Sequence, residues 1–473
     1  MPSAKRLQLL LLATLLSTGC TVRRYRATPI VPAESAARLE ARNFATPGLQ
    51  AYVERCVGHT ISPWPPKSWD LRTLTLAALY FNPAMEAARA NVAEAEAATV
   101  TAGARPNPTL SLTPGVPSPY LFNLDLAMPI ETAGKRGHRI QSARSLDEAA
   151  QFDLADVAWK VHSGVRLALL NCLLATRTLD SLHAEEQLRR EQLRLLEERL
   201  AAGEIASPQL EQPRIELAKI HLAAVAAEGR LSETKAALAA SLAIPVGALE
   251  GVELSWSLLD SPPPAGSLPA PMIQRDAVLN RLDVRRALAQ YAAAEANLQL
   301  EISKQYPDIQ IGPGYAYEEA KSYFTLGLSA TLPIFNRNQG PIAEAEARRR
   351  QAAAVFLEKQ TQVIAESESS LARYTSALDE LAEADHSLRN LQQVQLQRAQ
   401  RAVELGEEDR LALIGVQIEN AVLARGRLDA LARAQSSLGE LEDALQRPLD
   451  PGDAFPAAPG SATLNSLPKE LQQ

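Results

Sequence analysis

Two stretches of the chain alternate regularly between apolar residues and small polar residues. They are Phe122–Met128 and Phe324–Leu332, and weaker strand signals precede each of them. A period of two, with one apolar and one polar face, is the pattern of a β-strand. The sequence therefore predicts two β-hairpins, at residues 108–130 and 308–334. The small polar residues of the outgoing strands are Asn123, Asp125, Thr325, Gly327, Ser329 and Thr331.

A second pattern fills two much longer stretches, residues 139–202 and 341–405. Apolar residues recur there every seven positions, which predicts long helices packed as coiled coils. The first would extend about 100 Å at the rise of an α-helix. Glu186 and Arg189 interrupt its apolar seam. The seam residues are Val161, Val165, Ala168, Cys172, Ala175, Leu179, Leu182, Leu193, Leu196 and Leu200 in the first helix, and Ile364, Leu371, Tyr374, Leu378, Leu381 and Leu388 in the second.

Each long helix is followed by a glycine, Gly203 or Gly406, which is the residue that most often ends a helix. A return helix is predicted after each reversal, over residues 208–242 and 409–445. A shorter, Ala-rich helix is predicted before each hairpin, from about Thr73 to Ala102 and from about Ile273 to Lys304.

The order of elements is thus the same in both halves, so the chain is a duplicated domain. The repeats are residues 68–250 and 273–446, joined by a Pro-rich linker at 251–272. Residues 110–115 match 309–314, residues 122–126 match 324–328, and residues 128–130 match 332–334. A duplication of this length suggests that both halves are used in the same way around one object.

The ends of the chain have their own signals. Residues 1–19 hold two cations and an apolar run of about ten residues, which suits a secretory signal and is too short to span a bilayer. Cys20 follows Gly19 in the manner of a lipoprotein signal, so lipidation of Cys20 is predicted. The alternative is ordinary signal cleavage nearby. Residues 20–67 are predicted to form an extended arm, and residues 447–473 a disordered tail.

Composition narrows the classes of function. Aromatic residues make up 5% of the chain and the formal net charge is -7, so no nucleic-acid partner is expected. Six scattered His residues lack ligand spacing, and no phosphate loop or nucleophile motif is present. We expect no enzyme, no cofactor and no metal site. Cys56 and Cys172 could form a disulfide, although an unpaired, buried Cys172 is favoured.

Two hairpins supply four strands, whereas the smallest membrane barrels need about eight. The strands must therefore be pooled between copies of the chain. With the apolar faces toward lipid, Asn123, Asp125, Thr325, Ser329 and Thr331 would line a polar lumen. The strand count does not decide between two and three copies.

The arrangement resembles the TolC-type outer-membrane efflux proteins. The lipoprotein-like start, Trp69-Asp70-Leu71 leading to Asn82-Pro83, and the glycine at each reversal carry the resemblance. Residues 128–136 (MPIETAGKR) are similar to the heavy-metal cation export branch, the CzcC- and CusC-like proteins, whereas residues 332–340 (LPIFNRNQG) resemble a segment that this branch shares with its close relatives.

The resemblance implies a mainly α fold with one β-hairpin per repeat. Three chains would form a 12-stranded outer-membrane β-barrel continuous with a helical periplasmic tunnel. Its partners would be outer-membrane lipid, a periplasmic adaptor and an inner-membrane pump of the resistance-nodulation-division type. The substrate would be a heavy-metal cation, with an organic compound or drug as the alternative.

The resemblance also assigns roles to the two reversals. The adaptor would dock on Ala202, Gly203, Glu204 and Ile205 in one repeat, and on Leu405, Gly406, Glu407 and Glu408 in the other. Glu407, Glu408, Asp409 and Arg410 would form a charged periplasmic gate. The alternative is that these are solvated charges at helix ends, with Asp409 or Ser207 as an N-cap.

A rival of a different class is a non-porous coiled-coil lipoprotein that spans the periplasm as a structural element. It accounts for the long helices and the lipid, but not for two amphipathic hairpins at matched positions.

Overall fold

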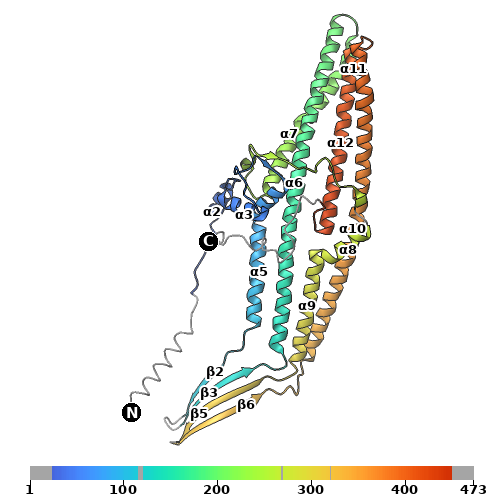
Figure 1. Ribbon diagram of the computed structural model, residues 1–473. Helices are drawn as coiled ribbons and strands as arrows, with labels where there is room; N and C mark the ends of the chain where they lie inside the picture. The colour runs from blue at the N-terminus through green and yellow to red at the C-terminus, as the bar shows by residue number, and fades with distance from the viewer. Residues whose placement is uncertain (1–23, 116–120, 268–269, 320, 450–473) are drawn as a thin grey trace. The chain divides into compact units, whose positions relative to one another are not determined.

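The computed structural model describes residues 24–115, 121–267, 270–319 and 321–449 (Figure 1). It divides into two compact units, Met1–Arg42 and Asn43–Gln473. In the first unit the described residues form one helix, α2 (Pro32–Glu40), which has no buried residue. The predicted signal peptide, Cys20 and most of the predicted tail lie outside the described residues.

The prediction of an extended arm over residues 20–67 is wrong where helices form. Besides α2, the helix α3 (Pro47–Val57) buries Leu49, Tyr52 and Val53. These three residues have the i, i+3, i+4 spacing of one helix face, and they belong to a core that also contains Leu71 and Leu74. The prolines around α3 stand at its first position and in the following loop, where they are compatible with a helix.

The second unit contains the duplicated elements in the predicted order. The first repeat comprises β1 (Ser68–Trp69), α4 (Leu71–Phe81), α5 (Pro83–Ala102), β2 (Thr109–Pro114), β3 (Leu121–Ile130), α6 (Lys135–Ala201), a 3-10 turn (Ser207–Leu210) and α7 (Glu211–Ser241). The connection contains β4 (Glu253–Leu254) between two further 3-10 turns, Val246–Leu249 and Ala265–Ser267. The second repeat comprises α8 (Ala270–Asn280), α9 (Leu282–Ser303), β5 (Ile309–Glu318), β6 (Lys321–Ala330), α10 (Gln339–Asn390), a π-helical turn (Leu391–Leu396), α11 (Gln397–Glu404) and α12 (Arg410–Leu445).

Three predicted helices are divided in the structure. The helix predicted from Ile273 to Lys304 is α8 and α9, because Arg281 between them adopts an extended conformation. The helix predicted from Thr73 to Ala102 is α4 and α5, because Asn82 adopts an extended conformation and caps α5 before Pro83. The second long helix is confirmed over most of its length, but a π-helical turn separates α10 from α11. A π-turn inserts one residue without a proline or glycine, so the heptad pattern gave no sign of it.

The long helix α6 is the helix around which most other helices of the second unit pack. It packs against α4, α5, α7, α9 and α12, and its predicted seam is buried from Val161 to Leu182, with Leu179 half-buried. In the second repeat Tyr374 and Leu381 are buried, whereas Ile364 is exposed in the single chain. Among the described residues, no helix is both long enough and apolar enough to cross a bilayer.

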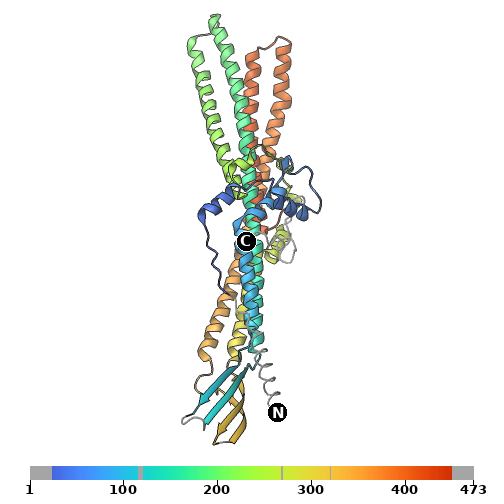
Figure 2. The same ribbon diagram turned by 90° about the vertical axis from the view of Figure 1, so that its left-hand side faces the viewer.

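The two hairpins join into one antiparallel sheet with the order β2-β3-β5-β6. The strands lie at one end of α6 and α10, and the helix reversals lie at the other (Figures 1 and 2). Both hairpins are therefore confirmed, and the structure shows in addition that β3 pairs directly with β5. The repeats are thus continuous through the sheet.

The ladder corrects the predicted match between the outgoing strands. Leu112 pairs with Leu124 in the first hairpin, and Ile311 pairs with Leu328 in the second. If residues 110–115 correspond to 309–314, Leu124 corresponds to Leu328 and not to Leu326. The match of residues 128–130 to 332–334 follows the same register. Strand alternation repeats every two residues, so a slip of two residues leaves the sequence pattern unchanged.

Buried ionic contacts hold the two repeats together in the middle of the helices. Arg166 on α6 and Glu442 on α12 are both buried, with Arg166 Nε 2.8 Å from Glu442 Oε2. The arginine also donates to the Gln435 carbonyl at 3.0 Å and lies over the Trp256 ring. Gly439 leaves the space that the guanidinium occupies, because a Cβ there would clash with it.

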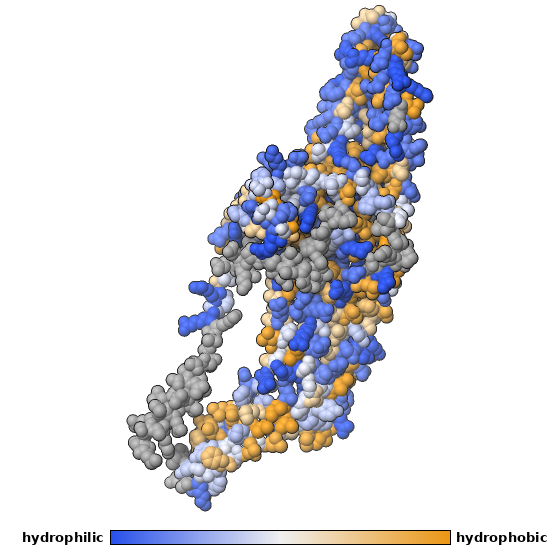
Figure 3. Space-filling model, viewed as in Figure 1, coloured by the Kyte–Doolittle hydropathy of each residue, from blue (hydrophilic) through white to orange (hydrophobic). Residues whose placement is uncertain are grey.

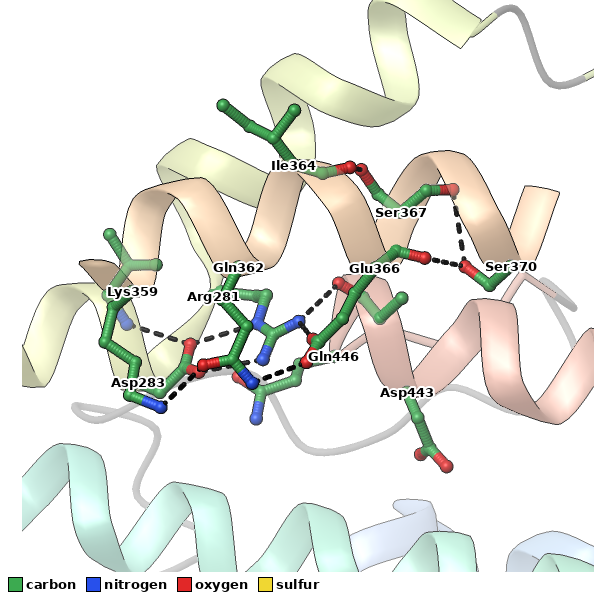
Figure 4. A network of polar contacts seen from close by, with 12 residues as sticks. Arg281, Asp283, Lys359, Gln362, Ile364, Glu366, Ser367, Ser370, Asp443 and Gln446 are labelled. Carbon is green, nitrogen blue, oxygen red and sulfur yellow. Dashed lines mark hydrogen bonds and ion pairs between the residues drawn. The ribbon is translucent and has the colours of Figure 1, made fainter. Parts of the chain in front are cut away.

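A second polar network surrounds Arg281, between α8 and α9 (Figure 4). Arg281 Nη2 lies 2.8 Å from Asp283 Oδ2, and Nη1 lies 2.6 Å from Glu366 Oε2 on α10. Gln446 accepts from the Leu282 N–H at 2.6 Å and donates to Asp156 of α6 at 2.8 Å. This network connects α9, α10 and α6 at the point where the chain enters the second repeat.

Two neighbouring carboxylates of α6 are buried and paired. Glu185 is buried and lies 2.6 Å from Arg189 Nε, and it also contacts Arg425 of α12. Glu186 is buried and receives contacts from Arg190 and His221. The residues that interrupt the predicted seam are therefore an ion-paired layer within it. Charges in such a place are retained only when they are paired.

Candidate functional site

The four-stranded sheet presents one polar and one apolar face. Residues directly opposite in an antiparallel ladder point to the same side, so the register assigns each face. Asp125 lies opposite Gly314, which lies opposite Thr325, and Gln310 lies opposite Ser329. Ladder residues on the polar face include Thr109, Ser111, Thr113, Asn123, Asp125, Gln310, Gly312, Gly314, Thr325, Gly327 and Ser329, and Ala127, Ala316 and Tyr323 lie on the same side.

The structure thus brings Asn123, Asp125, Thr325 and Ser329 together on one face, although they come from both repeats. Thr331 follows the last residue of β6 and is not part of the ladder. Gly314 permits this grouping, because a Cβ there would lie 2.5 Å from both Asp125 Oδ1 and Thr325 Oγ1. The importance of Gly314 was missed, since a glycine in a strand gives no sign of its cross-strand neighbours.

The other face of the sheet is apolar, and the described part of the chain leaves several of its large side chains exposed. Phe324, Leu326 and Leu328 on β6 are exposed, as are Leu110 and Leu112 on β2. In Figure 3, hydrophobic side chains gather over the strands, whereas hydrophilic ones dominate at the far end of the helices. An apolar surface of this extent on a sheet indicates contact with lipid or with another chain.

The two helix reversals have the same backbone structure. Gly203 and Gly406 each have a φ of 75°, in the left-handed region that favours glycine. Gly203 N–H donates to Leu200 and Glu204 N–H to Arg199, at 3.0 and 2.9 Å. Gly406 and Glu407 donate to Val403 and Ala402 in the same way, at 3.1 and 2.8 Å. Both turns are Schellman motifs, so the predicted reversals are confirmed.

The residues around each turn are accessible. Ala202, Glu204, Leu405, Glu407 and Glu408 are exposed, and Ile205 is half-buried. A cleft of about 310 Å³ lies between the two turns. It is lined by Leu195, Glu198, Arg199, Ala202, Glu204, Arg410 and Leu411.

Two ion pairs link the reversal of one repeat to that of the other. Arg199, at the end of α6, contacts Asp409, the residue before α12. Arg410 Nη2 lies 3.0 Å from Glu191 Oε1. Asp409 Oδ1 also accepts from the Ala412 N–H at 2.9 Å, so Asp409 is the N-cap of α12. Two of the four predicted gate residues thus have partners within the same chain.

These contacts shift the acidity of the two carboxyls. The Ala412 N–H and then Arg199 hold the pKa of Asp409 below its ordinary value of 3.8. A hydrogen bond from Arg194, and then the charges of Arg194 and Arg410, lower the pKa of Glu191. Glu191 and Arg199 were not predicted as site residues, because their partners are more than 200 positions away in sequence.

Among the described residues, no group of three or more His, Cys, Asp or Glu side chains could hold a metal ion. His162 is buried against Thr75, and burial lowers its pKa to about 4, so it is neutral near pH 7. Cys56 and Cys172 are free thiols, and Cys172 is buried as predicted.

Residues 75–243 match the model of a protein family described as outer membrane efflux protein. This segment lies within the first repeat. No curated protein matches the sequence.

Solved structures resemble the chain over most of its length. The outer membrane protein VceC from Vibrio cholerae is 19% identical, with a TM-score of 0.63 over 80% of this chain and 97% of that one. CusC is 19% identical, with a TM-score of 0.62 over 90% and 99%. The CmeC outer membrane channel of Campylobacter jejuni is 14% identical, with a TM-score of 0.63 over 95% and 98%. At these identities the likeness establishes a shared fold.

Proposed function

We propose that this chain is one protomer of an outer-membrane exit duct. Three copies would pool their sheets into a 12-stranded barrel, and their long helices would continue it as a periplasmic tunnel. The observation that carries the proposal is the sheet itself. It has one polar face, one uncovered apolar face and two open edges, and it stands at the end of helices that already have their own seams. A sheet of this kind is stable in a membrane only when its edges are closed.

The duct is passive and performs no chemistry. Asn123, Asp125, Thr325 and Ser329 line the lumen, with Thr331 at its periplasmic end, and the apolar face meets lipid. Gly312, Gly314 and Gly327 keep the lumen wall free of side chains between the polar groups. A conduit needs weak contacts along its wall, because a tight site would slow the passage of its substrate.

The reversals form the periplasmic mouth. The exposed turns Ala202–Ile205 and Leu405–Glu408 would receive the hairpin of a periplasmic adaptor, which couples the duct to an inner-membrane resistance-nodulation-division pump. Glu407 and Glu408 would carry negative charge at the mouth. The Arg199–Asp409 and Arg410–Glu191 pairs would hold it closed.

The barrel and the acylated Cys20 would both anchor the protein in the Gram-negative outer membrane. Replacing Cys20 with Ala should abolish labelling by palmitate, while the barrel keeps the protein in the membrane. Persistent labelling of Cys20→Ala would contradict the lipid anchor.

Planar-bilayer conductance of the purified protein tests the proposal against the non-porous lipoprotein. We expect discrete channels and a heat-modifiable oligomer that resists SDS. An oligomer without conductance would favour the structural rival.

The preferred substrate is a heavy-metal cation. This choice is supported by residues 128–136, which resemble the metal-export branch. A deletion strain tested separately with metal salts and with drugs distinguishes the two substrate classes. Sensitivity to drugs alone would overturn the metal assignment and leave the duct in place.

A further inference from the structure

The polar face of the sheet carries a carboxylate near the middle of the ladder. Asp125 lies halfway along the ten residues of β3, and its side chain is exposed. The other charged ladder residues on this face are Glu318 and Lys321, which lie opposite each other at the tip of the second hairpin, so their charges cancel. Glu319 lies in the turn beyond the ladder. Asp125 is therefore the one uncompensated charge of the described ladder on this face.

The neighbours of Asp125 in the sheet leave its carboxylate open. Gly314 lies opposite it, and Thr325 lies opposite Gly314. A Cβ on Gly314 would lie 2.5 Å from both Asp125 Oδ1 and Thr325 Oγ1, so these two side chains converge in space that only a glycine leaves free. On its other side Asp125 faces Ser111. The row thus presents one carboxylate and two hydroxyls, and no described cation pairs with the carboxylate.

The next row toward the helices holds only small residues. Thr109 lies opposite Ala127, and Gly312 lies opposite Gly327. None of these four has a side chain long enough to cover the carboxylate of Asp125. An ion that moves along this wall from the helices toward the hairpin tips therefore meets Asp125 as the first charge of the described ladder.

The duplication supplies this carboxylate only once per chain. In the corrected register Leu124 corresponds to Leu328, so Asp125 corresponds to Ser329. Ser329 is uncharged, and it lies opposite the equally uncharged Gln310. Three copies related by rotation would therefore place three carboxylates, and not six, at one level of the lumen.

We propose that Asp125 from each copy forms a ring of three carboxylates that makes the barrel lumen selective for hydrated cations over anions. The inference rests on the proposed function for the existence of the barrel, and it adds the residue that sets selectivity there. Rings of acidic side chains favour cations in water-filled pores. Carboxylate and hydroxyl oxygens suit hard cations, whereas the row holds no thiolate or imidazole that would select a soft metal ion. The ring therefore acts on the charge of the passing ion.

The size of the effect follows from the width of the barrel. Twelve strands spaced about 4.8 Å apart and tilted by about 40° enclose a radius of about 12 Å. Three charges at this distance, acting through water, would raise the ratio of cations to anions on the axis about twofold at about 0.15 M salt. At about 0.01 M salt, where the Debye length is about 30 Å, the ratio would rise about tenfold.

The reversal potential of single channels in a KCl gradient measures this selectivity. The dilute solution is placed on the side of the barrel, because the exposed Glu407 and Glu408 act on ions at the opposite end of the helices. Asp125→Asn keeps the shape of the side chain and removes its charge. Asn123→Asp adds one charge per copy on the same strand and the same face, one row away.

We expect Asp125→Asn to lower the permeability ratio of K⁺ to Cl⁻ about tenfold at about 0.01 M salt and about twofold at about 0.15 M salt. Adding Asn123→Asp to this variant should restore the ratio. Asn123→Asp alone should raise the ratio above that of the unsubstituted protein. Thr325→Val is the matched control, because it changes the same row without changing its charge, and its ratio should equal that of the unsubstituted protein.

An unchanged ratio in conducting Asp125→Asn channels would overturn the inference. A lowered ratio that Asn123→Asp fails to restore, or that Thr325→Val reproduces, would also overturn it, because the effect would then arise from altered structure and not from charge. If Asp125→Asn does not assemble, Asn123→Asp alone decides, and an unchanged ratio in that variant contradicts the ring. If the unsubstituted protein forms no channels, the proposed function fails together with this inference.

Discussion

Replacing Asp409 with Asn removes the ion pair that links the two reversals but keeps the cap of α12. Asn caps a helix about as well as Asp, so the fold of the turn should survive. Arg199 and Asp409 are 36% and 46% exposed, and an exposed pair is worth about 0.2–1 kcal/mol. If three copies open together, the loss sums to about 0.6–3 kcal/mol, which is a factor of about 3 to 150 in the closed–open equilibrium.

Single-channel recording measures this effect as an increase in open probability for Asp409→Asn. Arg348→Gln is a matched control, because its pair with Glu344 is exposed, lies within one helix and links no reversals. The pH dependence has a defined sign. The pKa of Asp409 is depressed, so its contribution is present above its ordinary value of 3.8 and is lost as the pH falls through the lower, folded value. Unsubstituted channels should therefore open more often in strong acid. Equal open probability in Asp409→Asn and in the unsubstituted protein at neutral pH, or an unsubstituted channel whose open probability does not rise in strong acid, would refute the closing role.

Three further substitutions test other parts of the structure. Gly406→Ala should destabilise the second reversal by about 1–2 kcal/mol, because Gly406 has a positive φ. The control Gly415→Ala, inside α12, should leave stability unchanged or increase it. The rate of proteolysis at the reversal measures both effects. Leu328→Arg should destabilise the inserted sheet by about 2–4 kcal/mol near the bilayer midplane and reduce assembly. Ser329→Arg should still assemble but change the conductance. Equal loss of assembly in both variants would contradict the assignment of the two faces. Glu442→Gln should lower the free energy of unfolding by about 3–5 kcal/mol, because it leaves the buried Arg166 poorly paired. Denaturation followed by tryptophan fluorescence measures this change, and an unchanged midpoint would contradict the role of the pair.

The periodic elements of this protein could be predicted from its sequence. Alternation fixed the two faces of β3 and β6, and the seven-residue spacing located α6 and α10. Glycine identified both reversals, because few other residues adopt a positive φ at low cost. Each of these signals arises within a few neighbouring positions, where the chain itself imposes the geometry.

The tertiary structure decided how those elements meet. The slip of two residues between the hairpins is invisible to a pattern of period two, so only the ladder could set it. The helix α3 is short and lies between prolines, and it is stabilised mainly by burial against α4.

The ion pairs could not be predicted from the sequence either. Arg166–Glu442 and Arg199–Asp409 join residues of different repeats, and an arginine on a helix gives no local sign of which distant carboxylate it will face. Periodicity records which side of an element is buried. Which residues pack against that buried side depends on contacts between segments hundreds of residues apart. The free energy of the whole folded structure determines their register and burial.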